Sequence, residues 1–183
     1  MNKDNEEIVI EKIERLAFLL AAGDGISEDE GFELEAFAGT MRAWLPFKKA
    51  VQEFEKSSDL TKAMKHVKGP PIHSHIMTFG LPEHVQDVAE EFKKILDSDD
   101  SVNEYHAYIK LLASEITDDF EQKISMCCIE DVLLADGISS FERASLTILG
   151  RCWGVSAIGA TRWFNESFHP IIEEANKLEP NYD

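Results

Sequence analysis

Hydrophobic residues recur three or four positions apart over most of the chain, the spacing of one helical face. Near the N-terminus this face consists of Ile13, Leu16, Ala17 and Leu20. Similar stripes follow up to residue 67 and again from residue 85 onward, and no stretch alternates apolar and polar residues with the period of two typical of a half-buried strand. The sequence therefore predicts an all-α protein, a compact bundle of about eight to ten helices built from repeated helical hairpins.

One segment interrupts this helical pattern. Residues 69–81 contain two glycines and two prolines, which favour a loop. A chain of 183 residues suits one large domain or two small ones. We expect a single all-helical domain over residues 1–183, with pseudo-halves 1–68 and 82–178 joined by the segment 69–81.

Two of the predicted helix connections have nearly the same sequence. They read "AAGDGISEDE" at residues 21–30 and "LLADGISSFE" at residues 133–142, and each contains Asp-Gly-Ile-Ser, two variable residues and Glu. In a helical hairpin the Gly suits the left-handed position that follows a helix, and the Ile packs back on the helix end. The Ser and the Glu three residues later form a capping box at the start of the next helix.

The connector role leaves one residue of each copy unexplained. Asp24 and Asp136 would lie at helix C-termini, where a negative charge is unfavourable by roughly 0.3–1 kcal/mol. Either each carboxylate bonds locally to the next helix, or it is kept for a hard cation together with Glu30 or Glu142. The spacing does not fit an EF-hand, which needs carboxylates at positions 1, 3 and 5 of its loop.

A degenerate third copy is suggested at residues 95–113, "ILDSDDSVNEYHAYIKLLA". It contains Asp97, Asp99 and Asp100 and an expected N-cap at Asn103, but it lacks the Gly and the Glu at the expected offset. By itself this copy is weak, although its distance from the second copy fits a repeated hairpin plan.

Charge and cysteine content narrow the classes of function. With 18 Lys and Arg against 35 Asp and Glu, the net charge is −17, which repels phosphate backbones and argues against nucleic-acid binding. No apolar run is long enough for a membrane span, and the acidic N-terminus does not resemble a signal peptide. Three cysteines, two of them adjacent, do not suggest a disulfide framework. We expect a cytoplasmic protein with reduced thiols.

Other candidate sites are weaker. His73 and His75 form an H-x-H in the Pro-rich segment, with His84 nearby, but an exposed loop explains them better than a metal site. The cysteines at positions 127, 128 and 152 lie on apolar stripes and are expected to pack in the core. The tryptophans at positions 44, 153 and 163 are expected to be core or helix-end anchors.

No known catalytic motif is present. The sequence lacks a G-x-S-x-G, a P-loop, a Gly-rich dinucleotide turn and an H-E-x-x-H. A helical di-metal carboxylate site needs two Glu-x-x-His motifs, and only Glu166 with His169 fits. An enzyme would need a pocket with perturbed carboxylates or histidines, expected near residues 69–84.

The repeated connectors resemble those of the TerB-like tellurite-resistance family, small all-helical proteins with helix–DG-I-S-x-x-E–helix units. The stretch at residues 129–156 is the most similar, and residues 16–41 match with Gly23 inserted before the Asp. Residues 46–84 have no counterpart. The resemblance implies an acidic cytoplasmic module tied to metal-ion or chemical stress, which binds divalent cations and meets protein partners near the membrane. It implies no reaction.

Together, these observations predict a non-enzymatic cytosolic TerB-like module that binds a divalent cation, a protein partner or both. The resemblance implies metal ligands at Asp24, Glu30, Asp136 and Glu142, and the cation would be Ca²⁺ or Mg²⁺. The alternatives are an enzyme with its site near residues 69–84, or a structural interaction protein in which the Asp-Gly turns are only helix caps. The oligomeric state is not readable from the sequence.

Overall fold

The amphipathic stripes form helices, as the sequence predicts. The computed structural model describes residues 3–72 and 82–178, and in these ranges every regular element is helical. The elements are α1 (Lys3–Ala21), α2 (Glu28–Trp44), the 3₁₀ turn η1 (Leu45–Phe47), α3 (Lys48–Ser57), α4 (Leu60–Met64), α5 (Glu83–Leu96), α6 (Ser101–Ser114), α7 (Asp119–Leu133), α8 (Ser140–Trp153), α9 (Ala157–Trp163), the π-helical turn η2 (Phe164–Phe168) and α10 (His169–Ala175).

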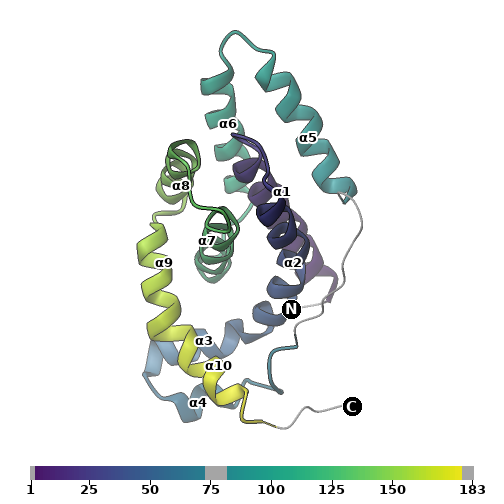
Figure 1. The fold of residues 1–183 in the computed structure, drawn as a ribbon. Helices are drawn as coiled ribbons and strands as arrows, with labels where there is room; N and C mark the ends of the chain where they lie inside the picture. The colour runs from purple at the N-terminus through teal and green to yellow at the C-terminus, as the bar shows by residue number, and fades with distance from the viewer. Residues whose placement is uncertain (1–2, 73–81, 179–183) are drawn as a thin grey trace.

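The helices enclose one core, with α1 and α7 at its centre. α1 packs against α2 and against α5, α6, α7 and α8, and α7 packs against α1, α2, α8 and α9. Figure 1 shows the α5–α6 hairpin at one end of the bundle and the short helices α3, α4 and α10 at the other. The N-terminal and C-terminal parts of the chain therefore contribute to the same hydrophobic core.

Most of the predicted stripes face this core. On α1, the side chains of Ile13, Leu16, Ala17 and Leu20 are fully buried. Burial of an aliphatic side chain of this size contributes roughly 1.5–3 kcal/mol, so this single helix face is a large part of the driving force for folding. It also fixes the rotation of α1, and with it the direction in which the loop after α1 leaves the bundle.

Not every residue of the expected apolar stripes is buried, and the exceptions include Leu96, Phe141, Cys152 and Ile158, each within two residues of a helix end. Leu96 is 58% exposed at the last turn of α5, and Cys152 is exposed near the end of α8. On α8 the buried face is Glu142, Ser145, Leu146, Leu149 and Trp153, and it shares only Ser145 and Leu149 with the predicted stripe of Phe141, Ala144, Ser145, Ile148, Leu149 and Cys152. The capping-box Glu142 turns inward at the start of α8, and the preceding Phe141 is left 37% exposed.

The three tryptophans are helix-end anchors, as predicted. Trp44 is the last residue of α2, Trp153 of α8 and Trp163 of α9. Trp153 also donates from its indole Nε1 to the carbonyl oxygen of Ala113 at 3.0 Å. An aromatic cluster around the fully buried Phe168 joins α2, η1, α7, α9 and η2. Its other rings are those of Trp44, Phe47, Phe120, Trp163 and Phe164, whose centroids lie 5.2–6.1 Å from that of Phe168.

Candidate functional site

Both Asp-Gly-Ile-Ser loops end in complete capping boxes, as predicted. The hydroxyl of Ser27 accepts from the Glu30 backbone N–H at 3.1 Å, and Glu30 Oε2 accepts from the Ser27 N–H at 2.8 Å. In the second copy, Ser139 and Glu142 make the same two bonds at 3.2 and 2.7 Å. Each box satisfies two backbone donors at the start of a helix and fixes the rotamer of its Glu.

The other half of the connector differs from the prediction. α1 ends at Ala21 and α7 at Leu133, so Gly25 and Gly137 lie four residues beyond the helices and not directly after them. Both glycines have positive φ, +105° and +103°, which a side chain would strain. Each loop therefore leaves its helix through an additional turn.

The longer turn also moves the two aspartates. Asp24 and Asp136 are exposed within the loops and do not occupy helix C-termini, so the unfavourable helix-end charge that the sequence suggested does not arise. The apolar residue that follows each Gly behaves differently in the two copies. Ile138 packs against the core, whereas Ile26 is 37% exposed.

The fold brings together the two capping-box carboxylates. Glu30 and Glu142 are each only 2% exposed. Burial raises the pKa of Glu30 above 4.5, hydrogen bonds from Ser27 lower it, and the adjoining carboxyl of Glu142 raises it. Two acids from distant parts of the sequence thus lie side by side in a site with little water, where like charges repel strongly.

One oxygen of this pair has no partner. Because Glu30 uses Oε2 in its capping box, Oε1 is left over, and it is buried without a hydrogen bond to any described residue. Glu142 also uses Oε2 for its capping box. Among the described residues, neither acid forms an ion pair with a Lys, Arg or His. A buried unsatisfied acceptor costs roughly 1–3 kcal/mol, more when it is charged, so the pair calls for a proton or a cation.

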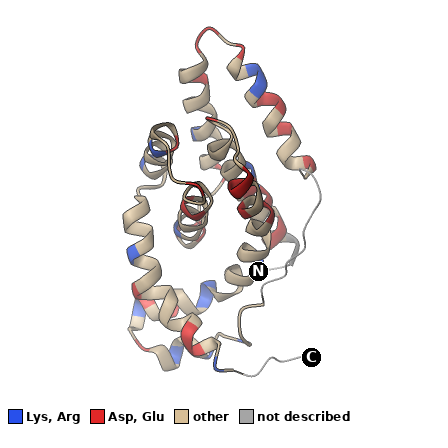
Figure 2. Ribbon diagram, viewed as in Figure 1, with Lys and Arg blue, Asp and Glu red and all other residues tan. Residues whose placement is uncertain are grey.

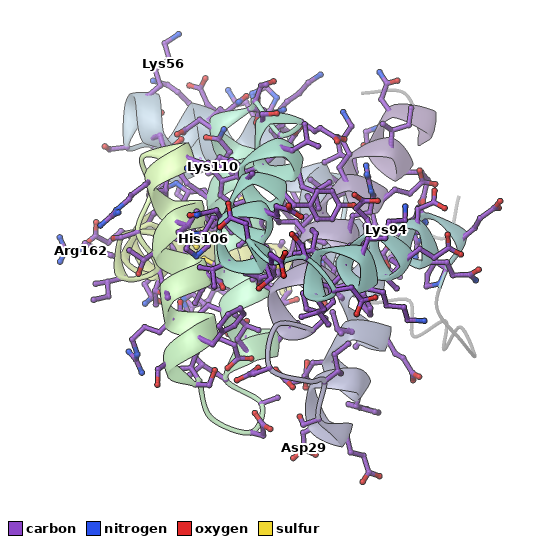
Figure 3. The ribbon with its side chains drawn as sticks, turned by 90° about the horizontal axis from the view of Figure 1, so that it is seen from above. Asp29, Lys56, Lys94, His106, Lys110 and Arg162 are labelled. Carbon is purple, nitrogen blue, oxygen red and sulfur yellow. The ribbon has the colours of Figure 1, made fainter. Side chains whose placement is uncertain are left out.

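Asp24 and Asp136 do not belong to the buried carboxylate pair. Across residues 3–72 and 82–178, no three His, Cys, Asp or Glu side chains are grouped as a protein metal cage would require. The charge of Asp24 nevertheless acts on the hydroxyl of Tyr105, next to the pair. Of the four predicted ligands, the structure thus brings Glu30 and Glu142 next to each other and leaves the two aspartates at the exposed surface of their loops. Asp29, adjacent to Glu30, points outward into solvent (Figure 3).

Tyr105 on α6 joins the end of α1 to α8, and the sequence reasoning missed this role. Its hydroxyl donates to the Leu19 carbonyl oxygen at the end of α1 (3.1 Å) and contacts the Ser145 hydroxyl on α8 (3.3 Å), and Ser145 donates to the Phe141 carbonyl (3.0 Å). Burial raises the pKa of Tyr105 to about 12, so the hydroxyl stays a donor. The one sign of this contact in the sequence is Ser145, a polar residue on an otherwise apolar helical stripe.

Gly23, the residue inserted before Asp24 in the first copy, has a packing role. A Cβ atom at this position would overlap the ring of Phe141 and lie 3.0 Å from the Tyr105 hydroxyl. The aromatic rings of Tyr105 and Phe141 pack with their centroids 5.0 Å apart. The first loop therefore docks on the second through a glycine, which brings Glu30 and Glu142 within reach of each other.

The degenerate third copy forms a hairpin without this chemistry. α5 and α6 pack against each other, and Asp100 is the N-cap residue of α6, although its side chain makes no capping bond to the backbone. The prediction that Asn103 is the cap is wrong. It lies inside α6 and donates from Nδ2 to Asp100 Oδ1 at 2.7 Å. Without a Glu three residues after the cap, this hairpin adds no carboxylate to the pair.

The histidines considered as metal ligands lie in different surroundings. His73 and His75 lie outside the described residues. His84, at the start of α5, pairs with Glu14 of α1, its Nε2 lying 2.9 Å from Glu14 Oε2. Burial raises the pKa of Glu14, and the nearby His84 partly offsets this shift. The contact fastens α5 to α1. His169, the other histidine considered, is half exposed and lies 4.0 Å from Glu173.

The cysteines do not form a site. Cys127 and Cys128 are buried on α7, as predicted, whereas Cys152 is exposed on α8. Burial raises the pKa of the Cys127 thiol to about 12 and that of Cys128 well above its usual value. Both buried thiols stay protonated at neutral pH, which makes them poor nucleophiles and poor metal ligands.

Comparison with known proteins adds no assignment. No family model matches the chain, and neither a curated protein nor a solved structure is significantly similar to it. Within the described part of the chain, no helix is both long and apolar enough to cross a membrane.

Proposed function

We propose that this chain is a non-enzymatic module that binds one divalent cation between its two Asp-Gly-Ile-Ser loops. The observation that supports this most directly is the buried, unpartnered Oε1 of Glu30 next to the carboxyl of Glu142. A hard cation in contact with both acids would neutralise their repulsion and satisfy the orphaned oxygen. Glu30 and Glu142 would hold it, and water or loop groups would complete its coordination.

The small number of protein ligands favours Mg²⁺ over Ca²⁺. Mg²⁺ keeps several of its waters and is usually bound through one or two carboxylates, whereas Ca²⁺ takes six to eight oxygens. Two capping-box acids match the first pattern. Asp24 and Asp136, exposed in the same loops, would act through charge and bound water. The overall net charge of −17 further favours cation capture.

In this proposal the cation controls how two hairpins dock. Glu30 belongs to the α1–α2 hairpin and Glu142 to the α7–α8 hairpin, so a shared ion joins them directly. The surrounding surface is partly apolar, because Ile26, Leu134 and Phe141 are 37%, 51% and 37% exposed. These side chains support a protein partner at the same end of the bundle, in keeping with the stress-response and membrane-proximal role that the resemblance to TerB-like proteins implies.

The test is thermal unfolding after EDTA treatment, with and without added Mg²⁺, Ca²⁺, Mn²⁺ or Zn²⁺. Linkage predicts an increase in stability of about 2.7 kcal/mol at one hundred times the dissociation constant. Glu30→Gln with Glu142→Gln should abolish the increase while keeping both capping boxes, since Gln fills the same capping position as Glu. Asp29→Asn, a charge change at an exposed neighbour, is the matched control and should leave the response intact.

Two results would contradict the proposal. One is a wild type whose stability no cation changes. The other is a cation response that survives in the double Gln variant, because the ion would then bind elsewhere. Asp24→Asn with Asp136→Asn measures the contribution of the loop aspartates separately. As simple turn residues, Asn should serve as well as Asp, and as charges acting on the ion, their loss should weaken binding.

A further inference from the structure

The positive charges of this acidic protein are concentrated in one segment. Residues 42–68 contain seven of the 18 Lys and Arg residues but only three of the 35 Asp and Glu residues. The segment thus has a net charge of +4 in a chain whose total is −17. In Figure 2, Lys and Arg residues lie on α3 and α4, at the end of the bundle away from the α5–α6 hairpin.

A groove lies within this segment. It encloses about 640 Å³ between the end of α2, η1, the start of α3 and residues 66–72. This volume falls within the roughly 300–1,000 Å³ of pockets that hold small ligands. The groove is separate from the carboxylate pair. It reaches Glu6 near the start of α1, whereas the first Asp-Gly-Ile-Ser loop follows the end of that helix, about 22 Å away at 1.5 Å per residue.

The walls of the groove combine apolar surface with free cations. Leu45 and Phe47 are buried beneath it, and Ile72 at its edge is 72% exposed. The pyrrolidine rings of Pro46, Pro70 and Pro71 also line it. Prolines have little conformational entropy to lose when they are covered, so such a wall is well suited to binding an apolar body.

Five basic residues line the groove, and two of them already have partners. Arg42 binds Glu7 through two contacts of 2.8 and 2.9 Å, and Lys48 binds Asp118 at 2.8 Å and Glu121 at 3.0 Å. These pairs hold the wall in place.

The other three basic residues are Lys49, His66 and Lys68, which are exposed and form no ion pair with a described carboxylate. Glu6 is the one acid among the residues that line the groove. Two unpaired lysines and a histidine therefore line a groove whose other wall is apolar.

We propose that this groove binds a small amphipathic anion, a carboxylate or phosphate attached to an apolar body. The cations would bind the anionic group, and the proline-lined wall would cover the body. A small ligand fits better than an acidic protein or an anionic membrane, because charges beyond about 10 Å are screened in dilute salt. A small anion experiences only the local positive field, whereas a large acidic surface would also meet the negative remainder of the molecule.

The experiment is calorimetric titration of the full chain with monomeric decanoate and decyl phosphate, against decanol, acetate and inorganic phosphate. The expected result is 1:1 binding of the two amphipathic anions, at least about tenfold tighter than that of the three simpler probes, and weaker at high salt. A parallel titration with 2-naphthoate identifies the source of the anion. Tighter binding of decanoate indicates an acyl chain, and tighter binding of naphthoate indicates a compact ring.

Matched variants locate the site. Lys49→Gln with Lys68→Gln removes two unpaired groove cations and should raise the dissociation constant by about tenfold. Lys56→Gln with Lys65→Gln removes the same charge from exposed lysines outside the groove, and Lys56 points away from the molecule in Figure 3. This pair should change the dissociation constant by less than about twofold. Equal losses in both pairs, equal binding of decanol, or no binding of either amphipathic anion would overturn the proposal.

Discussion

The carboxyls of Glu30 and Glu142 adjoin each other in the folded protein, although each also completes its own capping box. The capping bonds determine where each carboxylate lies, and the docking of the two hairpins places the acids together. Without a proton or a cation between them this arrangement is unfavourable, since Oε1 of Glu30 is buried without a hydrogen-bond donor. The arrangement therefore gives different predictions for the metal-free and the metal-loaded protein.

In EDTA, Glu30→Gln should stabilise the fold by about 1 kcal/mol, because an amide keeps the cap and removes a buried charge. Urea unfolding at pH 7 measures this change. Ser27→Ala is the comparison variant, since it removes the cap and should cost about 1 kcal/mol. If Glu30→Gln is instead as destabilising as Ser27→Ala, the Glu30 carboxylate has a favourable partner and the pair is not strained.

Stability of the metal-free protein should decrease as the pH rises from about 4.5 towards neutral. Because the pKa values of Glu30 and Glu14 are raised above 4.5 by burial, these acids bind more protons in the folded than in the unfolded state across that window. Their contribution is fully present below pH 4.5 and is lost as the pH rises through the folded-state pKa.

Unfolding free energies measured between pH 4 and 8 test this dependence. Self-repulsion of the acidic surface also lowers stability as the pH rises. The informative quantity is therefore the difference in unfolding free energy between the wild type and Glu30→Gln. That difference should grow with pH. A constant difference would show that Glu30 titrates alike in the folded and unfolded chain.

The sequence was sufficient for the helices and the capping boxes because both are determined by residues close together in the chain. The apolar stripe of α1 and the Ser-x-x-Glu at the start of α2 and α8 each act over a few positions. The pairing of Glu30 with Glu142 was only partly predictable. Repetition suggested that the two copies share a task, but contact between their acids depends on tertiary packing.

Some features had no local signal. The buried face of α8 includes Glu142, an acid that turns inward against the usual preference of Glu for solvent. The ends of α1 and α7 lie earlier than the glycines suggest, because an additional turn separates each Gly from its helix. The role of Tyr105 depends on groups from three helices, and no single stretch of sequence contains that information.

Tyr105→Phe should destabilise the fold by about 1–2 kcal/mol. The Tyr105 hydroxyl donates to the Leu19 carbonyl, which is one of the unpaired carbonyl groups at the end of α1, and it meets the Ser145 hydroxyl. A double-mutant cycle with Ser145→Ala separates the two contacts. A coupling energy near zero would show that the Tyr105–Ser145 contact contributes little, and that the Leu19 carbonyl alone accounts for the effect.

Gly150→Ala tests the packing of α8 against the turn into α9. Intrinsic helix propensity alone would predict the wrong sign for its effect on stability. Ala favours an α-helix over Gly by about 1 kcal/mol, and Gly150 lies within α8. A Cβ atom there would lie only 2.7 Å from the carbonyl oxygen of Val155, a backbone atom on the turn into α9. That turn is also fixed by the bond from the Val155 N–H to the Gly150 carbonyl oxygen at 3.0 Å.

Since the backbone around Val155 has little freedom to move, the variant should lose about 1–3 kcal/mol. Gly31→Ala in α2 is the matched control, because its Cβ would meet only the Ile26 side chain at 3.9 Å, an ordinary contact. It should gain about 0.5–1 kcal/mol. Chemical unfolding of both variants under the same conditions measures the two changes. A gain at both sites would mean that α9 moves away from α8 at little cost, and that the close approach at Gly150 does not fix the packing of these helices.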